Sequence, residues 1–246
     1  MITLLKNIFA RIWAIWGLVT FILTFLIIIG PSMLSHVYKN EKKGQDFFIA
    51  VSRYWIRFWL FLIACPLKIN GLQHFKNGES YVVVYNHNAF LDVPLSAAFI
   101  PSGNKTIAKD SFAKVPIFAW FYKRGGVMVN RANERSRTKS FEQMKKVLQK
   151  GMHMCLYPEG TRNRTEAPLK PFYDGAFKLA VDTHTQVLPG IILGTKKAMP
   201  IHKKLYLLPT KLSIHFLPPV NSNNISVKEL NTKVHELMEA EFVKYS

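Results

Sequence analysis

The sequence predicts an α/β fold with a central sheet, mostly parallel or mixed, that is flanked by helices and preceded by an N-terminal two-helix membrane anchor. Three observations support this prediction. The chain has 246 residues, enough for one domain and an appendage; its apolar residues crowd into the first 65 positions; and beyond Pro66 short apolar runs alternate with longer mixed segments. We therefore expect residues 1–66 to anchor the chain and residues 67–246 to form one globular domain.

The first predicted anchor helix is the run from Ile12 to Gly30, IWAIWGLVTFILTFLIIIG. No formal charge occurs between Ile12 and Tyr38, and the run is about as long as a helix that crosses a hydrocarbon core. A cleaved secretory signal would have a shorter apolar stretch and a small-residue cleavage site. We therefore expect a membrane segment. Its orientation is hardly decided by local charge, because basic residues lie on both sides of it: Lys6, Arg11, Lys39, Lys42 and Lys43.

The second predicted anchor helix, FFIAVSRYWIRFWLFLIACP, carries Arg53 and Arg57 four residues apart on one helical face. Two arginines near the middle of a bilayer would be costly, whereas a helix in the interface can place them among phosphates and bury its Trp, Phe and Leu face. We expect the second helix to lie in the interface, with a second full span as the alternative.

The globular part alternates predicted strands with predicted helices. The predicted strands are short apolar runs, several of them too uniformly apolar to have a solvent face: 81–85, 126–129, 153–157, 187–193 and 211–217. The predicted helices are 93–99, 116–123, 136–150, 175–182 and 226–245, the last capped by Ser226. Such alternation is typical of helices packed around a sheet that is at least partly parallel.

The charge of the chain points to a polyanionic partner. Lys and Arg number 33 against 15 Asp and Glu, a formal charge of +18, which suits nucleic acid, anionic lipid or a phosphorylated substrate. From Lys105 to Lys178 there are 16 basic and 6 acidic residues, and a phosphate-binding surface would explain this surplus. Cys65 and Cys155 form no CxxC pair and no histidine has metal-ligand spacing, so we expect no disulfide, no metal and a reducing compartment.

The segment from Asn86 to Asp92, NHNAFLD, directly follows a predicted strand. His87 and Asp92 would lie about 140° apart on a regular helix, so they can meet only if the chain turns between them. The carboxylate would then orient the imidazole as a general base that takes a proton from a hydroxyl. A capping aspartate beside a surface histidine is the simpler alternative.

Two further polar clusters follow predicted strands. They are Asn130-Arg131 and the segment YPEGTR at residues 157–162. In open α/β sheets ligands bind at this edge, although Arg131 and Arg162 also fit the ordinary role of solvated loop charges.

These motifs resemble the 1-acylglycerol-3-phosphate acyltransferases of the glycerolipid acyltransferase superfamily. The family motif Asn-His-x4-Asp is matched by Asn86, His87 and Asp92. The lysine-containing second block is matched by residues 108–112, 116–118 and 126–131, the Phe-Pro-Glu-Gly-Thr-Arg motif by residues 157–162, and the hydrophobic Val-Pro segment by residues 187–189. Asn130 stands where the family often has Asp, and Tyr157 where it usually has Phe.

The resemblance implies a membrane-bound 1-acylglycerol-3-phosphate O-acyltransferase of phospholipid synthesis with its catalytic domain on the cytoplasmic face. His87 would deprotonate the free hydroxyl of lysophosphatidate, which attacks the thioester of the acyl donor, while Asp92 holds the histidine. The donor would be an acyl-carrier-protein or acyl-coenzyme A thioester, and no cofactor is implied. No G-x-S-x-G nucleophile elbow is present, so direct transfer is the simpler route.

The resemblance also assigns a set of residues to the phosphate and head group of the acceptor: Lys109, Arg131, Glu159, Gly160, Thr161 and Arg162. Guanidinium and ammonium groups suit a phosphate. A carboxylate does not, so we expect Glu159 to orient a basic residue or to accept a hydrogen bond from a substrate hydroxyl.

Two alternatives follow from the sequence. The same motifs fit transfer to another acceptor, such as a lyso-aminolipid or glycerol-3-phosphate. The basic charge also fits a membrane-tethered nucleic-acid-binding protein, but no nucleic-acid-binding module is recognisable in the sequence, and we expect no nucleic-acid partner.

Overall fold

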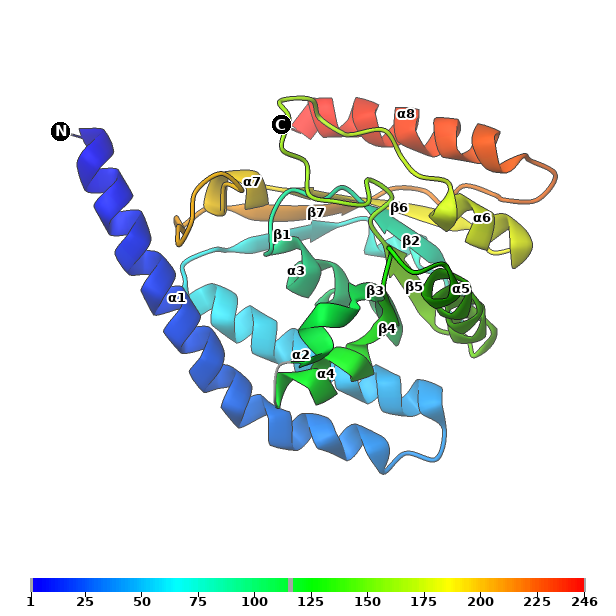
Figure 1. Cartoon of the computed structure of the whole chain (residues 1–246), viewed down its shortest axis with the longest axis horizontal. Coiled ribbons are helices and arrows are strands. Elements are labelled where there is room, and N and C mark those ends of the chain that lie inside the picture. Colours follow the sequence, from blue (N-terminus) through cyan, green and yellow to red (C-terminus); the bar gives the residue numbers. More distant parts are fainter. Residues whose placement is uncertain (1, 115–116, 246) are drawn as a thin grey trace.

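A single mixed sheet forms the centre of the domain. The structure, a computed structural model, describes residues 2–114 and 117–245. Within these residues seven strands lie in the order β1-β7-β6-β2-β5-β3-β4 (Figure 1). The strands are β1 (Leu67–Asn70), β2 (Val82–Tyr85), β3 (Asn104–Lys109), β4 (Gly126–Val129), β5 (His153–Leu156), β6 (Val187–Leu193) and β7 (Leu212–Phe216). Only the β6–β7 pair is antiparallel among them, which confirms the predicted mixed, mostly parallel sheet.

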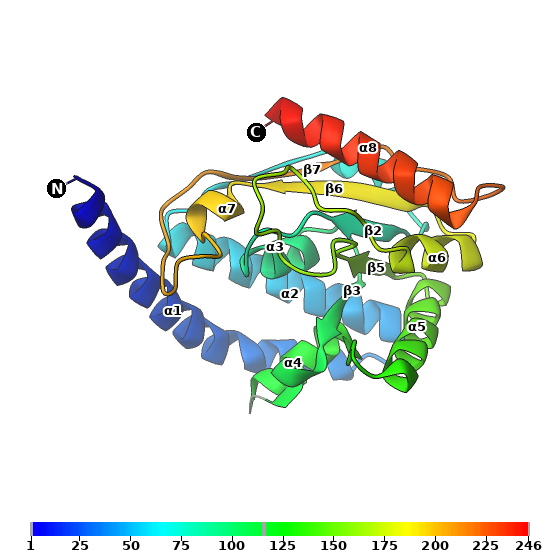
Figure 2. The same ribbon diagram turned by 45° about the horizontal axis from the view of Figure 1, so that its top comes forward.

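Helices cover both faces of this sheet (Figures 1 and 2). One face packs against α5 (Glu134–Gln149), α6 (Gly175–Asp182) and α8 (Val227–Tyr245), and the other against α2 (Glu41–Leu62) and α3 (Asp92–Ala98). Successive side chains of a strand point to opposite faces. Val82 and Val84 therefore pack on the side of α5, α6 and α8, and Val83 and Tyr85 on the side of α2 and α3. Burial on both faces explains why these strands are apolar throughout.

The first helix, α1 (Ile2–Met33), is the one helix of the described residues that is long and apolar enough to cross a membrane, and this suggests membrane association. Its 32 residues give a length of about 48 Å. Small residues such as Ala10, Ala14 and Gly17 are buried against the rest of the protein, whereas Leu18 and Ile22 are exposed. The surface left open by α1 is therefore apolar.

The second N-terminal helix, α2, corrects the expected two-helix anchor to one candidate membrane helix. Trp55 and Trp59 are 5% exposed in the same core as the sheet. Arg53 does not reach outward toward phosphates, because it donates hydrogen bonds to the carbonyls of Ala98 (2.9 Å) and Ile100 at the end of α3. The outer side of α2 still exposes aromatic side chains, namely Tyr54, Phe58 and Phe61.

Several elements differ from the sequence-based expectations. β1 and β3 were not predicted, nor was the short helix α7 (Thr195–Ala198). Pro116, the first residue of one predicted helix, lies outside the described residues, and α4 (Phe118–Gly125) begins two positions later. The cap of α8 is confirmed, since the Ser226 hydroxyl accepts from the Glu229 amide at 3.2 Å.

Candidate active site

The predicted site residues follow the carboxyl ends of neighbouring strands. His87 follows β2, Glu159 follows β5 and Arg131 follows β4, while Lys109 ends β3. These four strands are parallel and adjacent in the sheet, so their carboxyl ends meet at one edge. This is the edge at which ligands bind in open α/β sheets.

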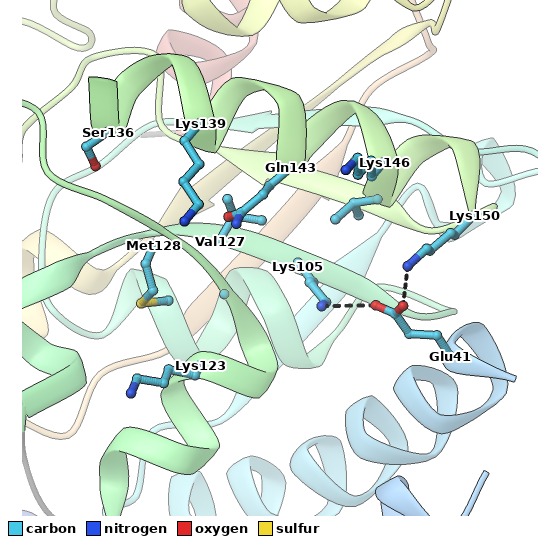
Figure 3. A pocket seen from close by; sticks show the side chains of 12 residues that line it. Glu41, Lys105, Lys123, Val127, Met128, Ser136, Lys139, Gln143, Lys146 and Lys150 are labelled. Carbon is cyan, nitrogen blue, oxygen red and sulfur yellow. Dashed lines mark hydrogen bonds and ion pairs between the residues drawn. The ribbon is translucent and has the colours of Figure 1, made fainter. Parts of the chain in front are cut away.

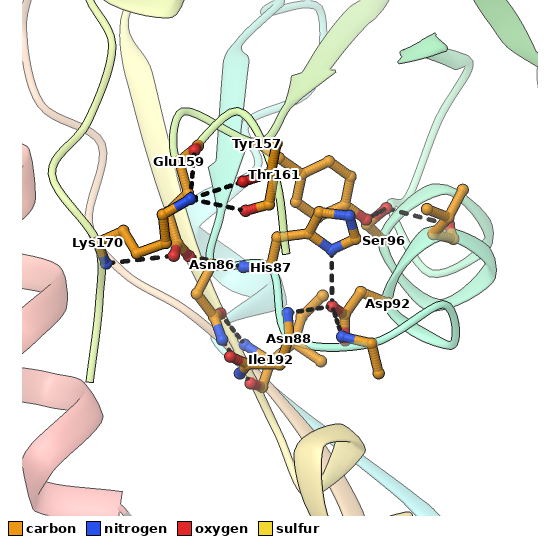
Figure 4. Close-up of polar contacts among 12 residues, drawn as sticks. Asn86, His87, Asn88, Asp92, Ser96, Tyr157, Glu159, Thr161, Lys170 and Ile192 are labelled. Carbon is orange, nitrogen blue, oxygen red and sulfur yellow. Dashed lines mark hydrogen bonds and ion pairs between the residues drawn. The ribbon is translucent and has the colours of Figure 1, made fainter. Parts of the chain in front are cut away.

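His87 and Asp92 meet as predicted (Figure 4). The chain turns after β2, and Asp92 opens α3, with its Oδ2 2.8 Å from Nδ1 of His87. The same oxygen accepts from the amides of Asn88 (2.6 Å) and Ala89 (2.7 Å), and Asp92 is fully buried. Three donors converge on Oδ2, so this oxygen is the acceptor and Nδ1 of His87 carries the proton.

This arrangement leaves Nε2 of His87 with its lone pair. Nε2 has no hydrogen-bond partner among the described residues, and 16% of the side chain is exposed. A neutral imidazole oriented in this way can accept a proton from a hydroxyl that approaches from solvent.

The backbone of His87 is held from both sides by the loop after β5. The amide of His87 donates to Oε1 of Glu159 (2.8 Å), and the carbonyl of His87 accepts from the amide of Asn163 (2.6 Å). The preceding residue, Asn86, pairs with the backbone of Ile192 on β6 through two hydrogen bonds of 2.9 and 2.7 Å. The position of the ring is therefore fixed by β6 and by the loop after β5.

Tyr157 packs on the other side of this site (Figure 4). Its ring stacks on the His87 ring with centroids 4.2 Å apart, and its hydroxyl lies 2.7 Å from the Ser96 hydroxyl on α3. Burial raises the pKa of Tyr157 well above its ordinary value, so the hydroxyl stays neutral. The tyrosine that replaces the usual family phenylalanine thus adds a link between β5 and α3.

Glu159 lies behind the surface, with none of its area exposed. Burial raises the pKa of its carboxyl to about 7, against the effect of the amides of His87 and Lys170, which donate to it. The ammonium group of Lys170 lies 2.7 Å from Oγ1 of Thr161 and 3.3 Å from the carbonyl of Glu159. Lys170 thus holds the turn at residues 159–161. It lies outside the motifs of the sequence, so its role was not predicted.

Two of the three basic candidates, Arg131 and Arg162, lie at this turn. Arg131 donates to the carbonyl of Gly160. The guanidinium of Arg162 lies 3.7 Å from the centroid of the exposed Phe90 ring, and burial lowers its pKa. Lys109 is exposed at the end of β3, and no ion pair within the described parts of the chain joins it to the other candidates.

Gly160 has a structural reason to be glycine. Its φ is +71°, and a Cβ at this position would lie 2.7 Å from the ring of Tyr173. A side chain here would strain the backbone and displace the turn, which carries Thr161 and accepts a hydrogen bond from Arg131.

The two cysteines are free and buried. Burial raises the pKa of Cys155 to about 12, so its thiol is protonated and a poor nucleophile. Within residues 2–114 and 117–245, no group of three His, Cys, Asp or Glu side chains is placed to hold a metal ion.

Comparison with known proteins assigns the chain to a family. The model of the Acyltransferase family matches residues 66–193, more than half of the chain. The chain belongs to the Acyltransferase family. The family resemblance predicted from the motifs is thus confirmed, and the matched region contains every predicted site residue.

Two relatives show how far the similarity extends. A 1-acyl-sn-glycerol-3-phosphate acyltransferase of Chlamydomonas reinhardtii is 35% identical over 145 residues, which is 58% of this chain and 43% of that protein. A chloroplastic 1-acyl-sn-glycerol-3-phosphate acyltransferase of Arabidopsis thaliana is 27% identical over 227 residues, 89% of this chain and 61% of that protein. The chain therefore spans only about half of the length of these relatives.

A solved structure shares the fold. The crystal structure of the 1-acyl-sn-glycerophosphate acyltransferase PlsC from Thermotoga maritima matches with a TM-score of 0.80 at 22% identity. The match covers 98% of this chain and 96% of that chain, so it includes the N-terminal helices as well as the sheet.

Proposed function

We propose that this chain is a membrane-bound 1-acylglycerol-3-phosphate O-acyltransferase, which transfers a fatty acyl group from a thioester to lysophosphatidate and yields phosphatidate. The observation that carries the proposal is the contact of 2.8 Å between His87 Nδ1 and the buried Asp92, which leaves Nε2 open beside the basic residues of the sheet edge. The names of the relatives state the same activity for those proteins.

The proposed reaction is a single displacement. Nε2 of His87 takes the proton of the acceptor hydroxyl as its oxygen attacks the thioester carbonyl, and Asp92 stabilises the imidazolium. The tetrahedral intermediate then breaks its C–S bond, and the imidazolium returns the proton to the departing thiolate. No group of the protein is acylated, which agrees with the protonated state of Cys155.

In this proposal the acceptor phosphate binds to the cations of the sheet edge. Arg131 and Arg162 each offer two N–H donors whose geometry matches two oxygens of a phosphate. Lys109 offers a single positive charge without such a geometry. Gly160 and Thr161 form the turn that lies between the guanidinium groups of Arg131 and Arg162 in the proposed site. Glu159 acts from behind, by holding the amides of His87 and Lys170.

The proposal also places the protein at a membrane. The apolar surface of α1 would insert, and the catalytic domain would lie on the cytoplasmic face, where an acyl-carrier-protein or acyl-coenzyme A thioester is the donor. No cofactor takes part in the proposed reaction. Both lipid substrate and product carry acyl chains, so a site held at the bilayer surface shortens their path.

The test is acyl transfer by the purified full-length protein in detergent, with palmitoyl thioesters as donor. Lysophosphatidate is compared with glycerol-3-phosphate and a lyso-ornithine lipid, and His87→Ala serves as the blank. Phosphatidate as the main product supports the proposal. Product formed from another acceptor alone would keep the chemistry and refute the acceptor.

A further inference from the structure

A groove lined by lysines lies outside the site described above (Figure 3). It is a hollow of about 510 Å³ between α5, the edge strand β4 and the start of α2. Its cationic lining consists of Lys105, Lys123, Lys139, Lys146 and Lys150, and Glu41 is the one acid among the described residues that line it. We call it the lysine groove.

Most of the positive charge in the lysine groove is unpaired. Lys105 and Lys150 both pair with Glu41. The ammonium groups of Lys123, Lys139 and Lys146 form no ion pair or hydrogen bond with any part of the chain that the structure describes. Three uncompensated charges in one concave surface attract an anionic partner strongly, because the hollow focuses their field.

The shape of the groove selects the kind of partner. Along α5 the lining residues Lys139, Gln143, Lys146 and Lys150 are spaced by four, three and four, which places them on one side of the helix, facing β4 (Figure 3). This stripe spans about 17 Å at 1.5 Å per residue. A second helix with carboxylates at the same spacing would match it charge for charge.

Two other anionic partners fit less well. A flat bilayer surface does not enter a concave hollow. A nucleotide would find no aromatic ring for its base, since none occurs among the described residues that line the groove.

A second hollow leads from the lysine groove toward the carboxyl ends of β3 and β4. It shares Ser136 and Lys139 with the groove and is also lined by Asp110 and Asn130. These two residues directly follow Lys109 and precede Arg131, the cations at the carboxyl ends of β3 and β4. The lysine groove itself begins at the amino ends of the strands, beside Lys105 and Gly126, so an acyl chain carried by a partner seated there would reach the edge of His87 along β3 and β4 and past this second hollow.

We propose that the lysine groove docks an acidic helical acyl carrier protein, which delivers the acyl thioester to His87. This inference rests on the proposed function, because it names the donor of the proposed reaction. The carrier contributes a helix whose carboxylates pair with Lys139 and Lys146, and Lys123 faces it from α4.

The test uses the full-length protein in detergent and the double variant Lys139→Glu/Lys146→Glu. Its matched control is Lys228→Glu/Lys233→Glu, which makes the same change of net charge at two exposed lysines of α8. Binding of fluorescently labelled palmitoyl-carrier protein is followed by anisotropy at several NaCl concentrations. KM is then measured for the carrier-bound and the coenzyme A-bound palmitoyl group.

We expect the groove variant to weaken carrier binding and to raise KM for palmitoyl-carrier protein by about tenfold or more, with a smaller salt dependence than wild type. KM for palmitoyl-coenzyme A should stay within about twofold, and the α8 control should resemble wild type. Circular dichroism and thermal unfolding verify that each variant is folded.

Three results would overturn the docking proposal. The first is unchanged carrier affinity in the groove variant, and the second is an equal loss of affinity in the α8 control. The third is a groove variant that binds the carrier normally but floats less well with anionic phosphatidylglycerol vesicles. The anisotropy measurement needs no turnover. Carrier binding at the groove without transfer to lysophosphatidate would therefore refute the proposed function and leave the docking site standing.

Discussion

The ring of His87 is oriented by contacts on three of its sides. Asp92 accepts from Nδ1, Tyr157 stacks on one face, and the backbone on either side of the ring is tied to Glu159 and Asn163. Because Nδ1 must donate to the carboxylate, the tautomer is fixed and Nε2 is left as the base. The local geometry thus orients His87 for the role of base in the proposed reaction.

Asp92→Asn should lower kcat sharply and change KM little. Three donors converge on Oδ2, and the single oxygen of an amide can take its place, but an amide is neutral and does not stabilise the imidazolium that forms when His87 takes a proton. The expected loss is about 10²- to 10⁴-fold in initial rate. Asp182→Asn, a surface carboxylate of α6, is the control; a loss below about threefold in Asp92→Asn would contradict the assigned role.

The sequence located the proposed catalytic pair, His87 and Asp92, but not all the residues that hold it. His87 and Asp92 stand in a motif with one spacing, so a turn between a strand and a helix was enough to bring them together. Lys170 and Asn163 lie beyond the YPEGTR motif and act through a loop. No periodicity or spacing rule places a loop residue against a distant turn, and for this reason they were missed.

At the scale of elements, residues 163–174 run back over the turn after β5, and α8 supports them. Lys170 contacts the carbonyl of Glu159 and the hydroxyl of Thr161, and its own carbonyl lies 3.2 Å from Nε2 of His235. Asn231, one turn earlier on α8, donates to the carbonyl of Phe172 at 3.1 Å. The C-terminal helix therefore stabilises the turn of the active site without reaching it.

Lys170→Met should raise KM for lysophosphatidate more than it lowers kcat. The variant loses the ammonium that ties residues 159–161 together, so the turn that carries Thr161 and accepts from Arg131 loosens. The loss in kcat/KM should be about 10-fold, near 1.4 kcal/mol. Lys170→Arg keeps a cation and should recover most of the activity. Equal losses in the two variants would exclude a role that depends on the charge.

The strand β3 was not predicted because one of its faces is buried but polar. β3 reads NKTIAK, in which Asn104 and Thr106 are buried on one face and lysines alternate with them on the other. Buried Asn104 is satisfied by the carbonyls of Ala97 (2.9 Å) and Ser102 (3.2 Å), a compensation that composition does not show. Uniformly apolar strands were found because burial on both faces leaves a signal in the sequence.

The start of β5 contains a buried histidine whose contacts require the neutral form. Nδ1 of His153 accepts from the Tyr81 amide at 3.1 Å, so the proton lies on Nε2, 2.8 Å from the Ser102 hydroxyl. Burial lowers the pKa of His153 to about 4. Protonation of Nδ1 would place its N–H against the amide N–H of Tyr81, and this hydrogen bond between the starts of β2 and β5 would be lost.

His153→Gln should reduce the pH dependence of folding stability. The folded pKa of about 4 lies below the unfolded value of 6.5, so the unfolded chain binds more protons between these limits. The stability that neutral His153 contributes is present above pH 6.5 and declines as the pH falls to 4, by about 3 kcal/mol. Urea unfolding of wild type and variant at pH 7 and pH 4.5 measures it. A stability difference between the two proteins that does not change with pH would contradict the assignment.

At the scale of the whole molecule, the chain has an apolar N-terminal surface and a basic catalytic domain. The outward residues of α1, such as Ile15, Leu18 and Ile22, are about half exposed. Charge and apolar surface together suit an anionic bilayer. The sequence showed this division, but it overstated the second anchor helix, because it could not show that Arg53 has backbone carbonyls of α3 as partners.

Ile22→Asp should weaken membrane binding by about 100-fold, since an aspartate within an inserted helix costs about 3 kcal/mol. Ile22 is 48% exposed, so the substitution leaves the core intact. Flotation with phosphatidylglycerol vesicles measures the partition. Val243→Asp, at a position of α8 that is 61% exposed, is the matched control. Equal flotation of both variants and wild type would show that α1 is not the membrane-binding surface.

The measurement that tests the central claim most directly is the initial rate of phosphatidate formation from lysophosphatidate and a palmitoyl thioester, for wild type and His87→Ala. If Nε2 of His87 is the base, the variant should be folded by circular dichroism and slower by about 10³-fold or more. A folded variant that keeps a tenth or more of the wild-type rate would contradict general-base catalysis by His87.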